Sequence, residues 1–109
     1  MRRFGQVLGI RPECIDEYKR HHAAIWPEIE HAIRVAGIRN YSIFLRGEQL
    51  FGYFEYHGPP DEYDTRMATL AQAPRMRDWW DVMEAMQVPD PQRVPGTWWS
   101  DMEEVFHQD

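Results

Sequence analysis

Two side chains that can give and take protons lie four residues apart in the first third of the chain. Tyr18 and His22 fall on the same face of a predicted helix, one turn apart. Histidine is the side chain whose ordinary pKa makes it both an acid and a base near neutral pH. The pair therefore indicates acid–base chemistry. One alternative stays open at this point: His22 bonds a backbone carbonyl inside the core, and Tyr18 only fills space.

Three further aromatic residues are candidates for the same site. Tyr41 lies at the start of a predicted strand, where its phenol can meet the sheet-facing side of that helix. Trp79 and Trp80 are adjacent in a predicted helix, so their side chains diverge by about 100° and at least one lines a cavity or is exposed. Aromatic faces beside hydroxyl and imidazole groups suit a sugar. We interpret a second pair, Trp98 and Trp99, as closing the core or a dimer edge.

Several common kinds of active site have no motif in this sequence. Cys14 is the only cysteine, which excludes a CxxC motif, and His21 and His22 are neighbours that point apart. There is no GxSxG nucleophile turn and no glycine-rich nucleotide loop. We therefore expect no metal and no cofactor. The protein either performs cofactor-free acid–base chemistry or only binds.

The composition narrows the choice of partners and location. Lys and Arg number 12 and Asp and Glu 18, and the net charge of −6 argues against nucleic acid or an anionic membrane as partner. No apolar run approaches the roughly 20 residues that span a bilayer. The first six residues lack the apolar core of a signal peptide, so we expect a cytoplasmic protein. The 109 residues suit one domain, 1–109.

The elements that must position these residues follow from periodicity. Residues 4–10 alternate as a strand does, and residues 12–36 carry the apolar stripe of a long helix. Pro27 predicts a kink or break near Trp26, and Gly37 suits the end of that helix. Residues 40–45 and 50–57 are typical of a hairpin.

The second half predicts two helices and a final strand. The helices cover 61–73 and 74–86, the proline-rich segment 88–96 is a loop, and the strand covers 98–107, with its best support at 102–107. The order β-α-β-β-α-β predicts the α+β class and a ferredoxin-like fold.

The predicted hairpin also indicates a homodimer. Phe51 and Tyr53 lie on one face of the second strand, and Leu50, Phe54 and Tyr56 lie on the other. Helices cover only one face of such a sheet, and an apolar second face is typical of an interface. The alternative is that aromatic side chains simply sit well on pleated surfaces.

Residues 17–29 read EYKRHHAAIWPEI, in which Tyr-x-x-x-His precedes Ile-Trp-Pro-Glu. This segment resembles the L-rhamnose mutarotase family. Residues 40–43, the pair at 79–80 with Met83, and the ending 104–107 agree, so the resemblance covers nearly the whole chain. It implies a homodimeric, ferredoxin-like dimeric α+β barrel that interconverts the α and β anomers of L-rhamnose at C1 without a cofactor.

The same resemblance implies roles for individual residues. His22 is the expected proton donor, and the sugar contacts are expected from Tyr18, Tyr41, Trp79 and Trp80. The loop 88–96 departs from the Asn-x-Asp-x-Ser-Pro pattern of the family, which leaves a related sugar such as L-fucose as a second possible substrate. The predicted fold is also compatible with a small oxygenase or haem-type enzyme, and with a non-catalytic dimeric binding module.

Overall fold

The computed structural model describes all residues, 1–109, and contains five strands and four α-helices. Their order confirms the predicted α+β class. The elements are β1 (Arg2–Ile10), α1 (Ile15–Ala23), α2 (Pro27–Val35), β2 (Ile38–Arg46), β3 (Gln49–Tyr56), α3 (Tyr63–Ala71), α4 (Met76–Met86), β4 (Gln87–Val88) and β5 (Ser100–Met102), with short 3₁₀ turns at Pro12–Cys14 and Pro60–Glu62.

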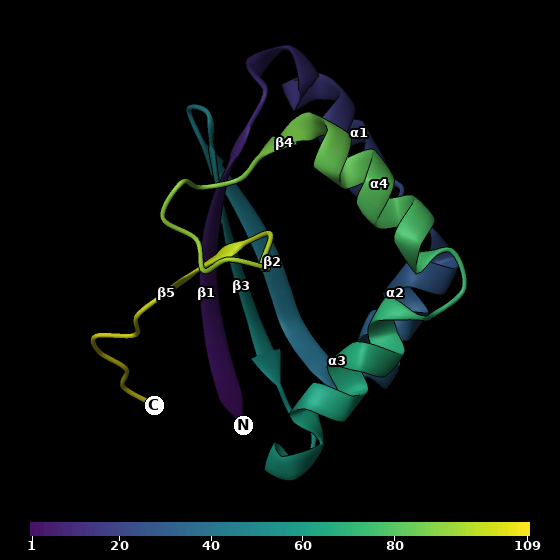
Figure 1. Ribbon diagram of the computed structural model, residues 1–109, viewed down its shortest axis with the longest axis vertical. Helices are drawn as coiled ribbons and strands as arrows, with labels where there is room; N and C mark the ends of the chain where they lie inside the picture. The colour runs from purple at the N-terminus through teal and green to yellow at the C-terminus, as the bar shows by residue number, and fades with distance from the viewer.

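The strands form one curled antiparallel sheet in the order β2-β3-β1-β4, and β5 also pairs with β1. Because β3 lies between β1 and β2, the connections are those of the ferredoxin-like fold predicted from the sequence. β4 and β5 share the outer edge of β1, at different heights along it. The helices all lie on one side of the sheet, and no element covers its other side (Figure 1).

The long first helix is broken where the sequence predicts a break. α1 ends at Ala23, and α2 begins at Pro27. Trp26 is extended, with φ −63° and ψ 129°, because the proline ring excludes the helical conformation from the residue before it. Gly37 follows α2 with φ +92°, the left-handed conformation that favours glycine after a helix.

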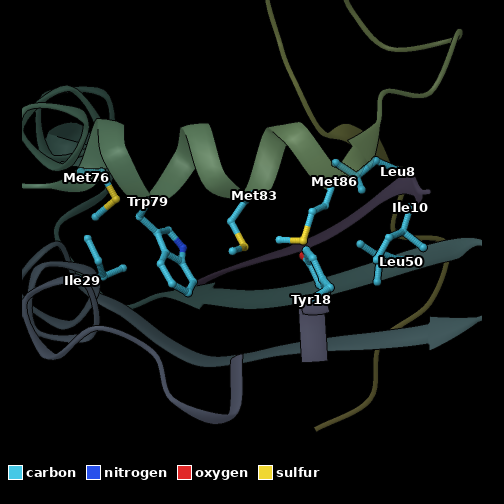
Figure 2. Packing of buried hydrophobic residues seen from close by; sticks show 9 residues of the cluster. All are labelled: Leu8, Ile10, Tyr18, Ile29, Leu50, Met76, Trp79, Met83 and Met86. Atoms are coloured by element: carbon cyan, nitrogen blue, oxygen red, sulfur yellow. The ribbon is translucent and has the colours of Figure 1, made fainter. Parts of the chain in front are cut away.

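The core lies between α4 and the sheet, as Figure 2 shows. α4 contributes four side chains at helical spacing, α1 and α2 contribute one each, and β1 and β3 contribute the rest. The nine residues are Leu8, Ile10, Tyr18, Ile29, Leu50, Met76, Trp79, Met83 and Met86. None of the helices is long and apolar enough to cross a membrane.

The end of the chain differs from the prediction. The expected strand over 98–107 is wrong outside Ser100–Met102, and the best-supported part, 102–107, is almost entirely irregular. Residues 102–107 do not alternate strictly between apolar and polar, so they offer no single face for a sheet to bury. Val105 and Phe106 are accordingly 87% and 78% exposed. The two-residue strand β4 lies where the predicted helix ends and the predicted loop begins.

Candidate active site

A cavity of about 990 Å³ lies between the helices and the sheet. Its walls are mostly apolar and come from all four helices, from the three long strands and from the segment before β5. The structure brings all five sequence-predicted site residues to this one cavity: Tyr18, His22, Tyr41, Trp79 and Trp80.

His22 projects from α1 and has one of its two ring nitrogens already bonded. Nδ1 donates a hydrogen bond to the backbone carbonyl of Tyr18 at 2.9 Å. A carbonyl oxygen only accepts, so Nδ1 carries the proton, and Nε2 is the nitrogen left with a lone pair. Burial lowers the pKa of His22 and favours this neutral form. The alternative that His22 bonds a backbone carbonyl in the core is therefore correct for Nδ1, and it leaves Nε2 unexplained.

Aromatic rings surround His22 on two sides. Its ring centroid lies 4.3 Å from that of Tyr18 and 5.6 Å from that of Trp79, which it meets edge to face. Trp79 is buried, whereas Trp80 is half-buried and has the Arg77 guanidinium 5.4 Å from its ring centroid. Both tryptophans line the cavity, in agreement with the divergence of neighbouring helical side chains.

Tyr41 reaches the cavity from an irregularity in β2. The pairing of β2 with β3 slips between Arg39 and Ser42, and Asn40 there has φ +53°. Such a bulge re-aims the side chains beside it, a device that is common next to active sites. Tyr41 is 39% exposed and packs against Phe54. Its partial burial raises the pKa of Tyr41 to about 12.

The Tyr18 hydroxyl has a partner that the sequence analysis missed. Gln87, at the junction of α4 and β4, donates from Nε2 to this hydroxyl at 3.0 Å and accepts at Oε1 from the indole Nε1 of Trp98 at 2.8 Å. Burial is the main reason why the pKa of Tyr18 is raised. A signal for Gln87 existed: with Met76 and Met83 it continues the buried stripe of α4, where a glutamine needs a hydrogen-bond partner.

The segment between β4 and β5 closes one side of the cavity. Arg93 donates to the backbone carbonyls of Thr97 and Asp90 at 2.9 and 3.4 Å, which ties the turn together. Trp98 and Trp99 follow that turn and line the cavity. Trp99 lies against Gly52 of β3, where an added methyl carbon would be only 3.3 Å from the indole ring.

The cavity is lined by carboxylates and an imidazole, but these side chains are not clustered as the ligands of a metal ion would be. No three His, Cys, Asp or Glu side chains are placed to hold one metal ion. What the site offers is an imidazole with a free nitrogen, two protonated phenols and several aromatic faces. That set can move a proton within a bound neutral molecule and can pack against its apolar faces.

Comparison with known proteins identifies the family. The model of the L-rhamnose mutarotase family matches residues 3–108. The chain belongs to the L-rhamnose mutarotase family. A curated L-rhamnose mutarotase of Opitutus terrae is 36% identical over 105 residues, 94% of each chain, and that of Lactiplantibacillus plantarum is 36% identical over 111 residues, 100% of each.

A solved structure supports the fold of this mutarotase-family chain. The crystal structure of L-rhamnose mutarotase from Formosa agariphila matches with a TM-score of 0.76 and 24% identity, covering 100% of both chains. The resemblance indicated by residues 17–29 is therefore confirmed as family membership, and it makes the chain an isomerase. The roles of the five site residues stay predictions.

Proposed function

We propose that this protein interconverts the α and β anomers of L-rhamnose at C1, with His22 as the proton donor. Family membership supports the reaction. The observation that carries the role of His22 is its hydrogen bond to the Tyr18 carbonyl, because this bond leaves one ring nitrogen free in a residue that lines the cavity.

Mutarotation requires one proton to move between two oxygens of the same carbon. When the ring opens, O1 loses its proton, the C1–O1 double bond forms, the C1–O5 bond breaks and O5 gains a proton. Because O1 and O5 are both bonded to C1, a single imidazole nitrogen can take the proton from one and return it to the other. His22 Nε2 accepts the O1 proton, and the resulting imidazolium is the donor to O5. General acid–base catalysis of this kind accelerates a reaction by about 10²–10⁴-fold.

The aromatic residues are proposed to hold the sugar rather than to react with it. A tyrosine phenol is protonated at neutral pH, and burial raises the pKa values of Tyr18 and Tyr41 further, so both can donate hydrogen bonds to sugar oxygens. The faces of Trp79 and Trp80 suit the apolar side of a 6-deoxy sugar and its methyl group. L-Fucose remains the second candidate, since the departing loop 88–96 leads into Trp98 and Trp99 at the cavity wall.

Saturation-transfer NMR on the C1 protons tests the proposal. The wild-type protein is expected to raise the exchange rate of the L-rhamnose anomers above the rate in buffer alone. His22→Ala is expected to lower the rate due to the protein by about 10²-fold or more. His31→Ala, which changes an exposed histidine on α2, is the matched control and is expected to leave the rate unchanged. An active His22→Ala protein that remains folded would contradict the role of His22, and running L-fucose in parallel identifies the preferred sugar.

We also propose that the protein is a homodimer in the cytoplasm. The partner we assign is a second copy of this chain, bound to the side of the sheet that no helix covers. Apolar side chains gather there, and they define what we name the open sheet face: Val7, Phe44, Phe51, Tyr53 and Met102. Phe44 and Met102 are 64% and 43% exposed in the single chain.

A further inference from the structure

A buried polar chain of three residues runs behind the candidate active site. It links Trp98 to Gln87 and Gln87 to Tyr18 through two hydrogen bonds. Gln87 is only 4% exposed and Tyr18 only 5%. Burying an amide without hydrogen-bond partners costs free energy. The two bonds of Gln87 avoid this cost, because they use both the nitrogen and the oxygen of its amide. An apolar residue at position 87 would make neither of these hydrogen bonds.

The chemistry of the three groups fixes the direction of every bond in the chain. An indole N–H can only donate, so the oxygen of the Gln87 amide faces Trp98. The amide nitrogen therefore faces Tyr18, and it too can only donate. The phenol oxygen of Tyr18 is the acceptor, and its own proton must point elsewhere. A flipped amide would set two N–H donors against each other at Trp98.

Tyr18 lines the cavity, and its ring lies against that of His22 at 4.3 Å between centroids. A sugar oxygen bound in this cavity would be the acceptor for the free Tyr18 proton. His22 is fixed in the complementary sense, since its Nδ1 proton is used by the Tyr18 carbonyl and its Nε2 accepts. One residue thus offers a fixed donor and its neighbour a fixed acceptor, which matches the two oxygens on C1 of an anomeric centre.

We propose that Gln87, oriented by Trp98, is a positioning residue that keeps Tyr18 a hydrogen-bond donor to the sugar. This inference rests on the proposed function, because it assigns Tyr18 to an oxygen of the bound sugar. It also gives a polar role to Trp98, which the sequence pattern predicted only to close the core or a dimer edge.

Replacing the amide of Gln87 by a carboxylate of the same shape reverses the direction of the hydrogen bond between residue 87 and Tyr18. In Gln87→Glu both oxygens accept, so Tyr18 turns its proton inward and presents a lone pair to the sugar. We expect kcat/KM near pH 8 to fall by about 10- to 100-fold, the range that corresponds to an unsatisfied buried polar group. When the carboxyl is protonated, its O–H donates to Tyr18 as the amide did. The rate relative to wild type should therefore recover as the pH is lowered.

Two further variants separate orientation from packing. Gln87→Met fills similar space without a polar group and leaves the Tyr18 proton free to rotate. The loss of kcat/KM in Gln87→Met should therefore be smaller than in Gln87→Glu and independent of pH. Trp98→Phe keeps an aromatic ring but removes the N–H that orients the amide, so we expect a several-fold loss that is also independent of pH. The exposed Gln92→Glu is the control for an added charge.

The outcomes are distinct. Equal losses in Gln87→Glu and Gln87→Met with no pH dependence would overturn the proposal, because Gln87 would then act through packing alone. A carboxylate acting only by its charge would raise the pKa of His22 and make the relative rate fall at low pH, the opposite of the expected trend. A wild-type protein that exchanges no sugar would contradict the proposed function instead. A slowly exchanging Trp98 indole proton in NMR, lost in Gln87→Met, tests the chain without any activity.

Discussion

His22 shows how one hydrogen bond can decide the chemistry of a residue. The carbonyl of Tyr18 holds Nδ1, which fixes both the tautomer and the plane of the ring. Trp79 and Tyr18 confine the ring from the sides. Burial then disfavours the charged imidazolium more than this bond favours it, so the pKa of His22 lies below its ordinary value. In the proposed mechanism, the neutral His22 is therefore a base, and it becomes an acid only after it has taken the sugar's proton.

The lowered pKa of His22 predicts the pH dependence of the reaction. Only the neutral ring can accept the first proton, so kcat/KM should stay level at neutral pH and fall only at pH values below the ordinary histidine pKa of about 6.5. The unfolded chain binds this proton more readily, so protonation should also lower the free energy of unfolding as the pH drops below about 6.5. Rates corrected for the buffer-catalysed reaction measure the first effect, and denaturant melts at several pH values measure the second. The NMR titration of the His22 ring gives its midpoint. A midpoint above 6.5 would contradict this account.

At the scale of residues, the sequence predicted well the relations between side chains that are close in the chain. Tyr18 and His22 meet because helical spacing alone brings positions four apart together. Trp79 and Trp80 diverge for the same reason. Gln87 escaped notice because its partners lie 69 and 11 residues away, across connections whose path no local pattern fixes.

At the scale of elements, the segment between β4 and β5 forms one wall of the cavity. Three prolines stiffen it, and Arg93 bridges its two ends through backbone carbonyls. Trp98 and Trp99 come directly after this bridge. The loop therefore sets where two indole rings stand at the cavity wall.

Cutting that bridge should affect sugar binding more than stability. We expect Arg93→Ala to raise KM several-fold with a smaller change in kcat, because the indoles lose their fixed position while His22 keeps its own. The free energy of unfolding should fall by only about 0.5–1.5 kcal/mol, as for the loss of a typical hydrogen bond near the surface. Steady-state rates and denaturant melts measure the two effects. Arg46→Ala, at the exposed β2–β3 turn, is the control, and equal KM values in both variants would contradict the role of Arg93.

The elements themselves were predictable where one physical rule dominated. Pro27 fixed the helix break, and Gly37 the end of α2. The prediction of the final strand failed because strand propensity in 102–107 is not matched by pairing: the last residue of β5 that pairs with β1 is Met102, opposite Gly5. The bulge at Asn40 likewise has no local signal, since it depends on how β2 pairs with β3.

The whole molecule buries one face of its sheet and leaves the other bare. Only 17 of the 109 residues are buried, partly because a cavity occupies the space between sheet and helices. A chain of this length has little core to spare, and covering the open sheet face with a second copy would add to it. Polar groups border this face: Arg3 pairs with Glu104 at 2.9 Å, and Glu55 accepts hydrogen bonds from Tyr53, Asn40 and His57. An apolar centre with a polar rim is the usual composition of an interface.

One charge placed at the centre of the open sheet face should separate the proposed dimer. Phe44 is 64% exposed and pairs with Phe51 of β3, so a second copy would bury it. Phe44→Lys would bury an unpaired ammonium, and the dimer should give way to a species of the 13.1 kDa chain mass in sedimentation or light scattering at micromolar concentration. Val35→Lys introduces the same charge at an equally exposed valine, 63%, on the helical side, and should leave the dimer intact. A wild-type protein that sediments as a single chain at every concentration would refute the dimer, and an undissociated Phe44→Lys dimer would move the interface to another surface.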